Sequence, residues 1–336
     1  MKPAGRGTLT AGARAALWAL PLAAALAAFC IGRIAVSPAQ LFAALRGEGE
    51  AVVAITLFRL RLPRILLSLL VGAGLAAAGV AFQALFANPL ATPDTLGVAS
   101  GASFGAALGI LLRFDMTGIQ LTALTMGAAA VALTWLGAAG RRARGLSSVV
   151  LSGIMIGSLF TALVSFVKYT ADAESQLPAI TYFLMGSMQS ASWRTLAFGA
   201  PPVLAGCAVL WALRWRLNLL PLTEDEARAA GVNLMRLRAA VVAAATLITA
   251  SCVSMCGQVG WVGLLVPHLC RLRFGENHLS LLPASLCVGA AFLTLVDTAA
   301  RSISAAEIPI SILTALAGAP LFILLMRRTA LEGGAS

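Results

Sequence analysis

Apolar stretches of about twenty residues recur along the whole chain, separated by short polar segments. A helix of this length can cross the roughly 30 Å of hydrocarbon in a bilayer. Helices are the expected form of each crossing, because no water is present there to satisfy backbone groups. The pattern predicts an all-α, polytopic membrane protein with about ten transmembrane helices: Ala15–Ile34, Ile65–Phe86, Leu96–Leu112, Gly118–Ala138, Ser147–Val167, Leu196–Leu213, Ala239–Met255, Val259–Leu269, Leu281–Ala299 and Ile308–Met326. The eighth segment is too short to cross alone, which leaves nine crossings and a re-entrant segment as an alternative.

Composition agrees with a single transmembrane domain over residues 1–336. The chain is 60% hydrophobic and 11% charged, whereas soluble domains carry about a quarter charged residues. The net charge of +11 does not indicate nucleic acid, because the arginines form small clusters without a basic, aromatic-lined face. The six cysteines contain no CxxC pair, which argues against a zinc ribbon or a disulfide framework. The basic N-terminus resembles a signal peptide, but its long apolar run favours an uncleaved first span.

The positive residues predict the orientation. With the N-terminus in the cytoplasm, 15 of the 24 Lys and Arg residues fall on the inside, and this bias places both termini there. Nine positives remain outside, among them Arg61, Arg64 and Arg301. These three arginines are either anchors at the membrane surface or docking points for an acidic partner. Asp297 precedes Arg301 by four residues, so an ion pair between these two is expected.

The longest inside connection, residues 214–238, contains a helix signal. Thr223, Glu224, Asp225 and Glu226 form a capping box with acids at the positive helix end, and Gly231 stands where a helix stops. This predicts a short helix outside the membrane. It is either a loop helix without a partner or a rigid element that receives force from a cytoplasmic motor, and we favour the second.

A polar break interrupts the apolar pattern between residues 86 and 94, with Asn88, Pro89, Pro93 and Asp94. Irregular backbone at membrane depth is tolerated where it lines a cavity or is buried in protein. The break is therefore a tight turn or the lining of a gate. Gly101, Gly105 and Gly109 share one helix face, and such small-residue faces let helices approach closely in lipid.

Several signals of chemistry are missing from the sequence. It has no GxxxxGK[ST] loop, so ATP binding by that route is excluded. His268 and His278 have no acid or nucleophile at catalytic spacing, and we expect no catalytic, cofactor or metal site. The membrane acids Asp297 and Glu307 lie near an outer end, which disfavours an ion-coupled secondary transporter but leaves it as the alternative. A membrane-embedded transferase would need paired acids or a His/acid cluster at a membrane face. The sequence shows neither, which argues against this class of enzyme.

Five segments together resemble one family, the FecCD permeases of ATP-binding-cassette importers for iron chelates and siderophores, haem and cobalamin. They lie in family order and cover nearly the whole chain from about Arg59: RLPRILLSLLVGAGLAAAGVAFQALFANPLATPDTLGVASGA (Arg61–Ala102), MGSMQSASW (Met185–Trp193), LTEDEARAAGV (Leu222–Val232), GQVGWVGLLVPHLCRL (Gly257–Leu272) and DTAARSISAAEIPISILTALAGAPLFILLMRR (Asp297–Arg328). Cys270 and Arg273 depart from the small or aliphatic residues common in the family.

The resemblance implies an inner-membrane importer of two permease subunits, two cytoplasmic ATPase subunits and a periplasmic substrate-binding protein. The second permease is another copy or a paralogue, and membrane lipid is the other partner. This chain would translocate a metal chelate, with iron(III)-siderophore expected ahead of haem or cobalamin, and hydrolysis would occur on the ATPases. Spans five and ten would meet the second permease. The matching residues imply binding-protein docking at Arg61, Arg64 and Arg301; an ATPase coupling helix with Thr223, Glu224, Glu226, Arg228 and Gly231; and a cytoplasmic gate at Asn88, Leu90 and Ser147.

Overall fold

The computed structural model describes residues 11–32, 36–48, 51–138, 146–304 and 307–333, and all regular structure within these ranges is helical. The helices are α1 Ala11–Cys30, α2 Pro38–Leu45, α3 Ala51–Ile55, η1 Thr56–Arg61, α4 Leu62–Leu85, η2 Pro93–Leu96, α5 Val98–Leu111, α6 Met116–Ala138, α7 Leu146–Thr170, α8 Gln176–Leu184, α9 Trp193–Leu213, η3 Arg216–Leu219, α10 Glu224–Ala229, α11 Leu234–Cys256, α12 Val262–Phe274, α13 His278–Ile303 and α14 Ile310–Gly333.

Every predicted span overlaps one of these helices, but fewer than ten are long and apolar enough to cross a membrane by themselves. Six in the described part of the chain meet both criteria: Ala51–Leu85, Met116–Ala138, Ser147–Thr170, Trp193–Leu213, Leu234–Cys256 and His278–Ile303. Three further apolar helices are shorter: Ala15–Cys30, Val98–Leu111 and Ile310–Leu324. The predicted eighth span coincides with α12, which has only 13 residues. The structure thus shows a multi-pass, all-helical protein without establishing ten crossings.

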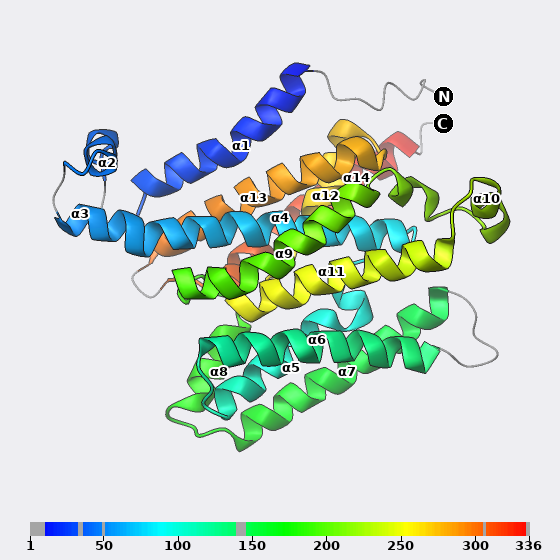
Figure 1. Ribbon diagram of the computed structural model, residues 1–336, viewed down its shortest axis with the longest axis horizontal. Coiled ribbons are helices and arrows are strands. Elements are labelled where there is room, and N and C mark those ends of the chain that lie inside the picture. Colours follow the sequence, from blue (N-terminus) through cyan, green and yellow to red (C-terminus); the bar gives the residue numbers. More distant parts are fainter. Residues whose placement is uncertain (1–10, 33–35, 49–50, 139–145, 305–306, 334–336) are drawn as a thin grey trace.

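Helices α4, α11 and α13 form the centre of the molecule. Buried residues make up 78% of the apolar window in α4 and in α11, but only 28% in α7 and α9. In Figure 1, α5, α6, α7 and α8 gather on one side of α11, while α4, α9 and α13 lie on its other side. The weakly buried helices therefore form the rim, where apolar side chains such as Ile154 and Leu204 are exposed.

Glycines bring the central helices into backbone contact. A Cβ added at Gly72 would lie 2.2 Å from the carbonyl oxygen of Gly289 on α13, and one added at Gly79 would lie 2.0 Å from that of Gly263 on α12. The glycine face of α5 packs in the same way against α6, since a Cβ at Gly105 would lie 2.2 Å from the Thr122 carbonyl oxygen. The expected close packing of this face is confirmed within the chain.

The two ends of the molecule carry different features. Figure 1 shows α2 and α3 at one end of the long axis and α10 at the other. Helix α3, the π-helical turn η1 and α4 are continuous, and η1 ends at Arg61. The structure therefore separates the segment that holds Arg61 and Arg64 from the loop that holds Thr223 and Gly231 by the length of the helical bundle.

Candidate functional site: two opposite ends of the helical bundle

The three arginines predicted to dock a partner come together at the α2–α3 end. Arg61, Arg64 and Arg301 all line one pocket of about 310 Å³, with Gln189 and Glu307 among its other residues. Arg61 and Arg301 are 5% and 8% exposed. The structure thus joins residues more than two hundred positions apart in one basic pocket, but it presents little of their surface to solvent.

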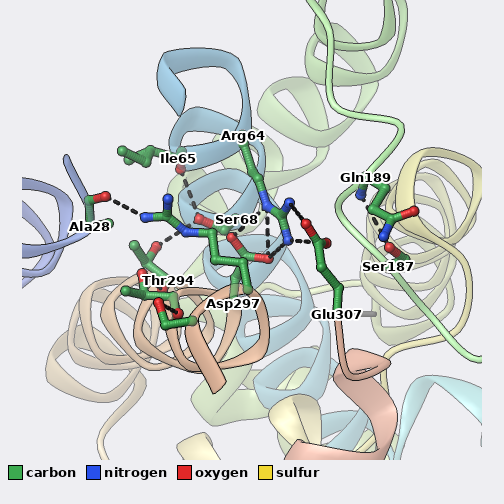
Figure 2. A network of polar contacts seen from close by, with 12 residues as sticks. Ala28, Arg64, Ile65, Ser68, Ser187, Gln189, Thr294, Asp297 and Glu307 are labelled. Atoms are coloured by element: carbon green, nitrogen blue, oxygen red, sulfur yellow. Dashed lines mark hydrogen bonds and ion pairs between the residues drawn. The ribbon is translucent and has the colours of Figure 1, made fainter. Parts of the chain in front are cut away.

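Arg64 is held between two carboxylates (Figure 2). Its Nη2 donates to Asp297 Oδ1 at 2.8 Å and to Glu307 Oε2 at 3.0 Å, and its Nε donates to Asp297 Oδ2 at 3.0 Å. Asp297 is only 2% exposed. Charge-assisted, bidentate contacts of this kind are the strong hydrogen bonds of proteins. The sequence pattern pointed to Arg301 as the partner of Asp297, whereas in the structure Asp297 bonds to Arg64, because α4 and α13 pack side by side.

Arg61 and Arg301 instead reach the end of α1. Arg61 Nη1 donates to the Phe29 carbonyl and Arg301 Nη2 donates to the Ala28 carbonyl, both in the last turn of that helix. The C-terminal carbonyls of a helix lack intrahelical partners and carry partial negative charge, so guanidinium groups stabilise them. A Cβ at Gly32 would lie 2.9 Å from a guanidinium nitrogen of each arginine, so the absence of a side chain at Gly32 allows this approach.

At the opposite end, the predicted capped helix is present as α10. The Thr223 hydroxyl accepts from the Glu226 backbone N–H at 3.4 Å, and the Thr223 backbone N–H donates to Glu226 Oε2 at 2.9 Å. The backbone hydrogen bond from Thr223, followed by the bond from its hydroxyl, lowers the pKa of Glu226. The capping contact therefore contributes stability above the unfolded pKa of Glu226 and loses it as pH falls through the lower folded value.

Helix α10 is fixed to the bundle at one point and exposed elsewhere. Ala227 is fully buried in the main apolar core, whereas the side chains of Glu224 and Arg228 are 67% and 75% exposed and 3.9 Å apart. Gly231 has a φ of +71°, and the Val232 N–H returns to the Ala227 carbonyl at 2.9 Å. Left-handed backbone at this position suits glycine and closes the helix. The result is a short, rigid projection with charged side chains facing outward.

The predicted gate residues are exposed at this same end. The loop after α4 turns through an Asx contact, in which Asn88 Oδ1 accepts from the Leu90 N–H at 2.9 Å. Leu90 is 51% exposed, and Ser147 is exposed at the start of α7. Helix η2, which follows the loop, packs on α7, where a Cβ at Gly153 would lie 2.1 Å from the Thr95 carbonyl oxygen. The loop and α7 are therefore mechanically linked through η2.

Sequence reasoning missed the small helices α2 and α3. Ser37 and Gln40 form a complete capping box at the start of α2, and this signal was readable because Ser-Pro-x-Gln is a helix start. The pairing of Glu307 with Arg64 had no such signal, since 243 residues separate them. Within the described residues, no group of three or more His, Cys, Asp or Glu side chains could hold a metal ion.

Comparison with known proteins places the chain among transport permeases. The family model of the FecCD transport family matches residues 20–328. The molybdate import system permease protein MolB of Haemophilus influenzae is 47% identical over 266 residues, which cover 79% of each chain. The cobalamin import system permease protein BtuC of Halobacterium salinarum is 40% identical over 80% of this chain and 72% of its own. The hemin transport system permease protein HmuU of Yersinia pestis is 36% identical over 80% of this chain and 82% of its own.

Two solved structures share the architecture. The inward-facing structure of a putative metal-chelate type ABC transporter superposes with a TM-score of 0.87 at 42% identity, covering 94% of this chain and 98% of that one. PsaBC from Streptococcus pneumoniae, solved in complex with Fab, shows the fold alone, with a TM-score of 0.61 at 17% identity over 82% and 93% of the two chains. The expected resemblance is confirmed: this chain belongs to the FecCD transport family and is a multi-pass permease of the metal-chelate ABC importer type.

Proposed function

We propose that this chain pairs with a second permease, either its own copy or a paralogue, and with two cytoplasmic ATPase subunits and a periplasmic binding protein. The observation that carries this proposal is the placement of a basic pocket and a capped, exposed helix at opposite ends of one bundle. One end suits an acidic protein outside the membrane, and the other suits a motor inside. The chain itself performs no bond chemistry, and ATP hydrolysis belongs to the partner subunits.

The proposed topology has about ten crossings with both termini in the cytoplasm. The excess of inside arginines supports this orientation, and the shorter helices α1, α5, α12 and α14 would complete the count. The second permease would cover α7 and α14, whose exposed residues include Ile154, Met155 and Leu316 at 57%, 65% and 68%. The path would run between the two permeases, with Asn88, Leu90 and Ser147 at its cytoplasmic gate.

Two cargo classes deserve direct comparison. Iron(III)-siderophore is the cargo expected from the family resemblance, and a relative named for iron chelatin supports it, whereas relatives named for hemin and cobalamin support the wider class of metal chelates. Molybdate is the second candidate, because the molybdate permease is 47% identical, against 40% for the cobalamin permease. Elemental analysis of the cognate binding protein as purified separates molybdate (molybdenum), cobalamin (cobalt) and the iron cargoes, and the visible absorption band of the porphyrin separates haem from an iron(III)-siderophore.

Reconstitution tests the proposal as a whole. Vesicles that contain the permease pair and the ATPases should accumulate the identified cargo only when both ATP and the loaded binding protein are supplied. The permease alone, under a proton or sodium gradient, should accumulate none. Accumulation by the permease alone, without nucleotide or binding protein, would establish the secondary transporter and overturn the proposal.

The docking role of the basic pocket predicts a charge-dependent loss of affinity. Replacing Arg61, Arg64 and Arg301 together by glutamate should weaken binding of the loaded binding protein at least about tenfold, because like charges would then face its acidic surface. The loss should depend strongly on salt. Binding is measured on folded permease isolated by gel filtration. The control is Arg194→Glu, which reverses an exposed arginine outside the pocket; equal affinity in the triple variant and this control would remove the docking role.

A further inference from the structure

A long apolar groove runs between α6 and α11 on the rim of the bundle. Its volume is about 560 Å³, within the roughly 300–1,000 Å³ of pockets that enclose small ligands. Ten of its eleven lining residues are apolar, the exception being Thr246, and Ala243 lies exposed along it. Because α6 and α11 belong to membrane-spanning segments, the groove opens toward the hydrocarbon of the bilayer.

The length of the groove corresponds to half a membrane. On α6 its lining extends from Leu124 to Trp135, and on α11 from Met235 to Leu247. At about 1.5 Å per residue these stretches are about 16 and 18 Å long, close to the roughly 15 Å that one leaflet contributes to the hydrocarbon core. In Figure 1 the last turns of α6 and the first turns of α11 lie toward α10. The lining, which begins at Trp135 and Met235 in these turns, therefore starts at the α10 end of both helices and ends near the membrane midplane.

The α10 end of the groove is positively charged. Arg238 follows Met235 by three residues and precedes Val242 by four, so it lies beside these two lining residues of α11 without lining the groove itself. It is half-buried, and its Nε has no hydrogen-bond partner among the described residues. Arg236 is exposed on a different side of α11, where it lines a second pocket with Arg216 and Gly231. The nearby Glu224 faces Arg228 at 3.9 Å, so its charge is partly balanced within α10.

We propose that this groove binds one anionic phospholipid of the cytoplasmic leaflet, with an acyl chain along α6 and α11 and the headgroup phosphate on Arg238. Basic residues beside an apolar groove between spans are the expected recognition surface for such lipids. Trp135 at the same end of the groove suits the membrane–water interface. The inference rests on the proposed orientation, which places this end in the cytoplasm.

The test uses the intact importer in detergent, incubated with phosphatidylglycerol or phosphatidylcholine and analysed by native mass spectrometry. Wild type should retain one phosphatidylglycerol per permease chain more strongly than phosphatidylcholine. Arg238→Gln should weaken phosphatidylglycerol retention about fivefold, the effect of roughly 1 kcal/mol per arginine at a membrane surface. Ala243→Trp, which fills the groove, should reduce the retention of both lipids.

Each variant has a matched control. Arg273→Gln removes an exposed arginine at the same end, and Ala208→Trp adds an indole to an exposed position on α9; neither residue lines the groove. Both controls should retain lipid as wild type does. Equal retention of the two lipids by wild type would overturn the inference. So would retention of phosphatidylglycerol by Arg238→Gln or Ala243→Trp that equals the wild-type retention. Binding-protein-dependent transport by wild type in phosphatidylcholine vesicles tests the proposed function separately, because it does not require an anionic lipid.

Discussion

Replacing residues 223–231 with a glycine–serine linker of equal length should reduce transport to the level measured without ATP. The assembled importer should still insert and still hydrolyse ATP, but hydrolysis should no longer depend on the loaded binding protein. The reason is mechanical: a capped helix fixed to the core through Ala227 can transmit a displacement, whereas a flexible linker cannot. Transport and ATPase activity are measured in the same vesicles.

Two comparisons make this result specific to the helix. Replacing the exposed segment 172–175, between α7 and α8, by a glycine–serine linker of equal length should leave transport intact. Thr223→Ala, which removes the cap and costs about 1 kcal/mol of local helix stability, should lower transport partially, while Thr223→Ser should retain it. If transport survives the linker replacement, α10 is not the coupling element.

The second large effect concerns stability. Arg64→Met should destabilise the folded permease by about 3–5 kcal/mol, because it leaves the Asp297 carboxylate buried without its partner. Denaturant-induced unfolding in detergent, followed by tryptophan fluorescence, measures the change. The double variant Arg64→Met/Asp297→Leu should recover much of the loss, since it removes both charges of the buried pair and leaves only the more exposed Glu307 carboxylate.

An exposed ion pair in the same chain provides the control. Arg194 and Asp115 are 2.7 Å apart, about the same as the 2.8 Å between Arg64 and Asp297, but their side chains are 69% and 55% exposed. Arg194→Met should therefore cost no more than about 1 kcal/mol. A similar loss in both variants would mean that burial does not govern the contribution of the Arg64 pair.

Local features of the structure were readable from the sequence. Apolar runs located the ten predicted segments on helices, and Thr223 with Glu226 marked the start of α10. These signals act over a few residues, through hydrophobicity and capping. The number of crossings was harder to predict because α5 and α12, with 14 and 13 residues, are apolar but short. Length alone cannot decide whether such a helix spans the bilayer or ends within protein.

Contacts between distant residues were not readable. The i,i+4 spacing pointed to a pair between Asp297 and Arg301, whereas the observed partner of Asp297 is Arg64, 233 residues away. Likewise, nothing in the sequence indicates that Arg61 and Arg301 cap the last turn of α1. Such pairings depend on which helices pack together, and that arrangement is set by the whole bundle. The family resemblance grouped the three arginines, but their internal partners required the structure.

The bare backbone contacts of α4 with α12 and α13 restrict how the molecule can move. Gly72 with Gly289 and Gly79 with Gly263 leave no side chain between the helices that could change rotamer to permit sliding. These three helices should therefore keep their positions relative to one another during transport. Displacement received at α10 would then be taken up by the less buried rim, above all α7, which is fastened to the Asn88 loop through η2.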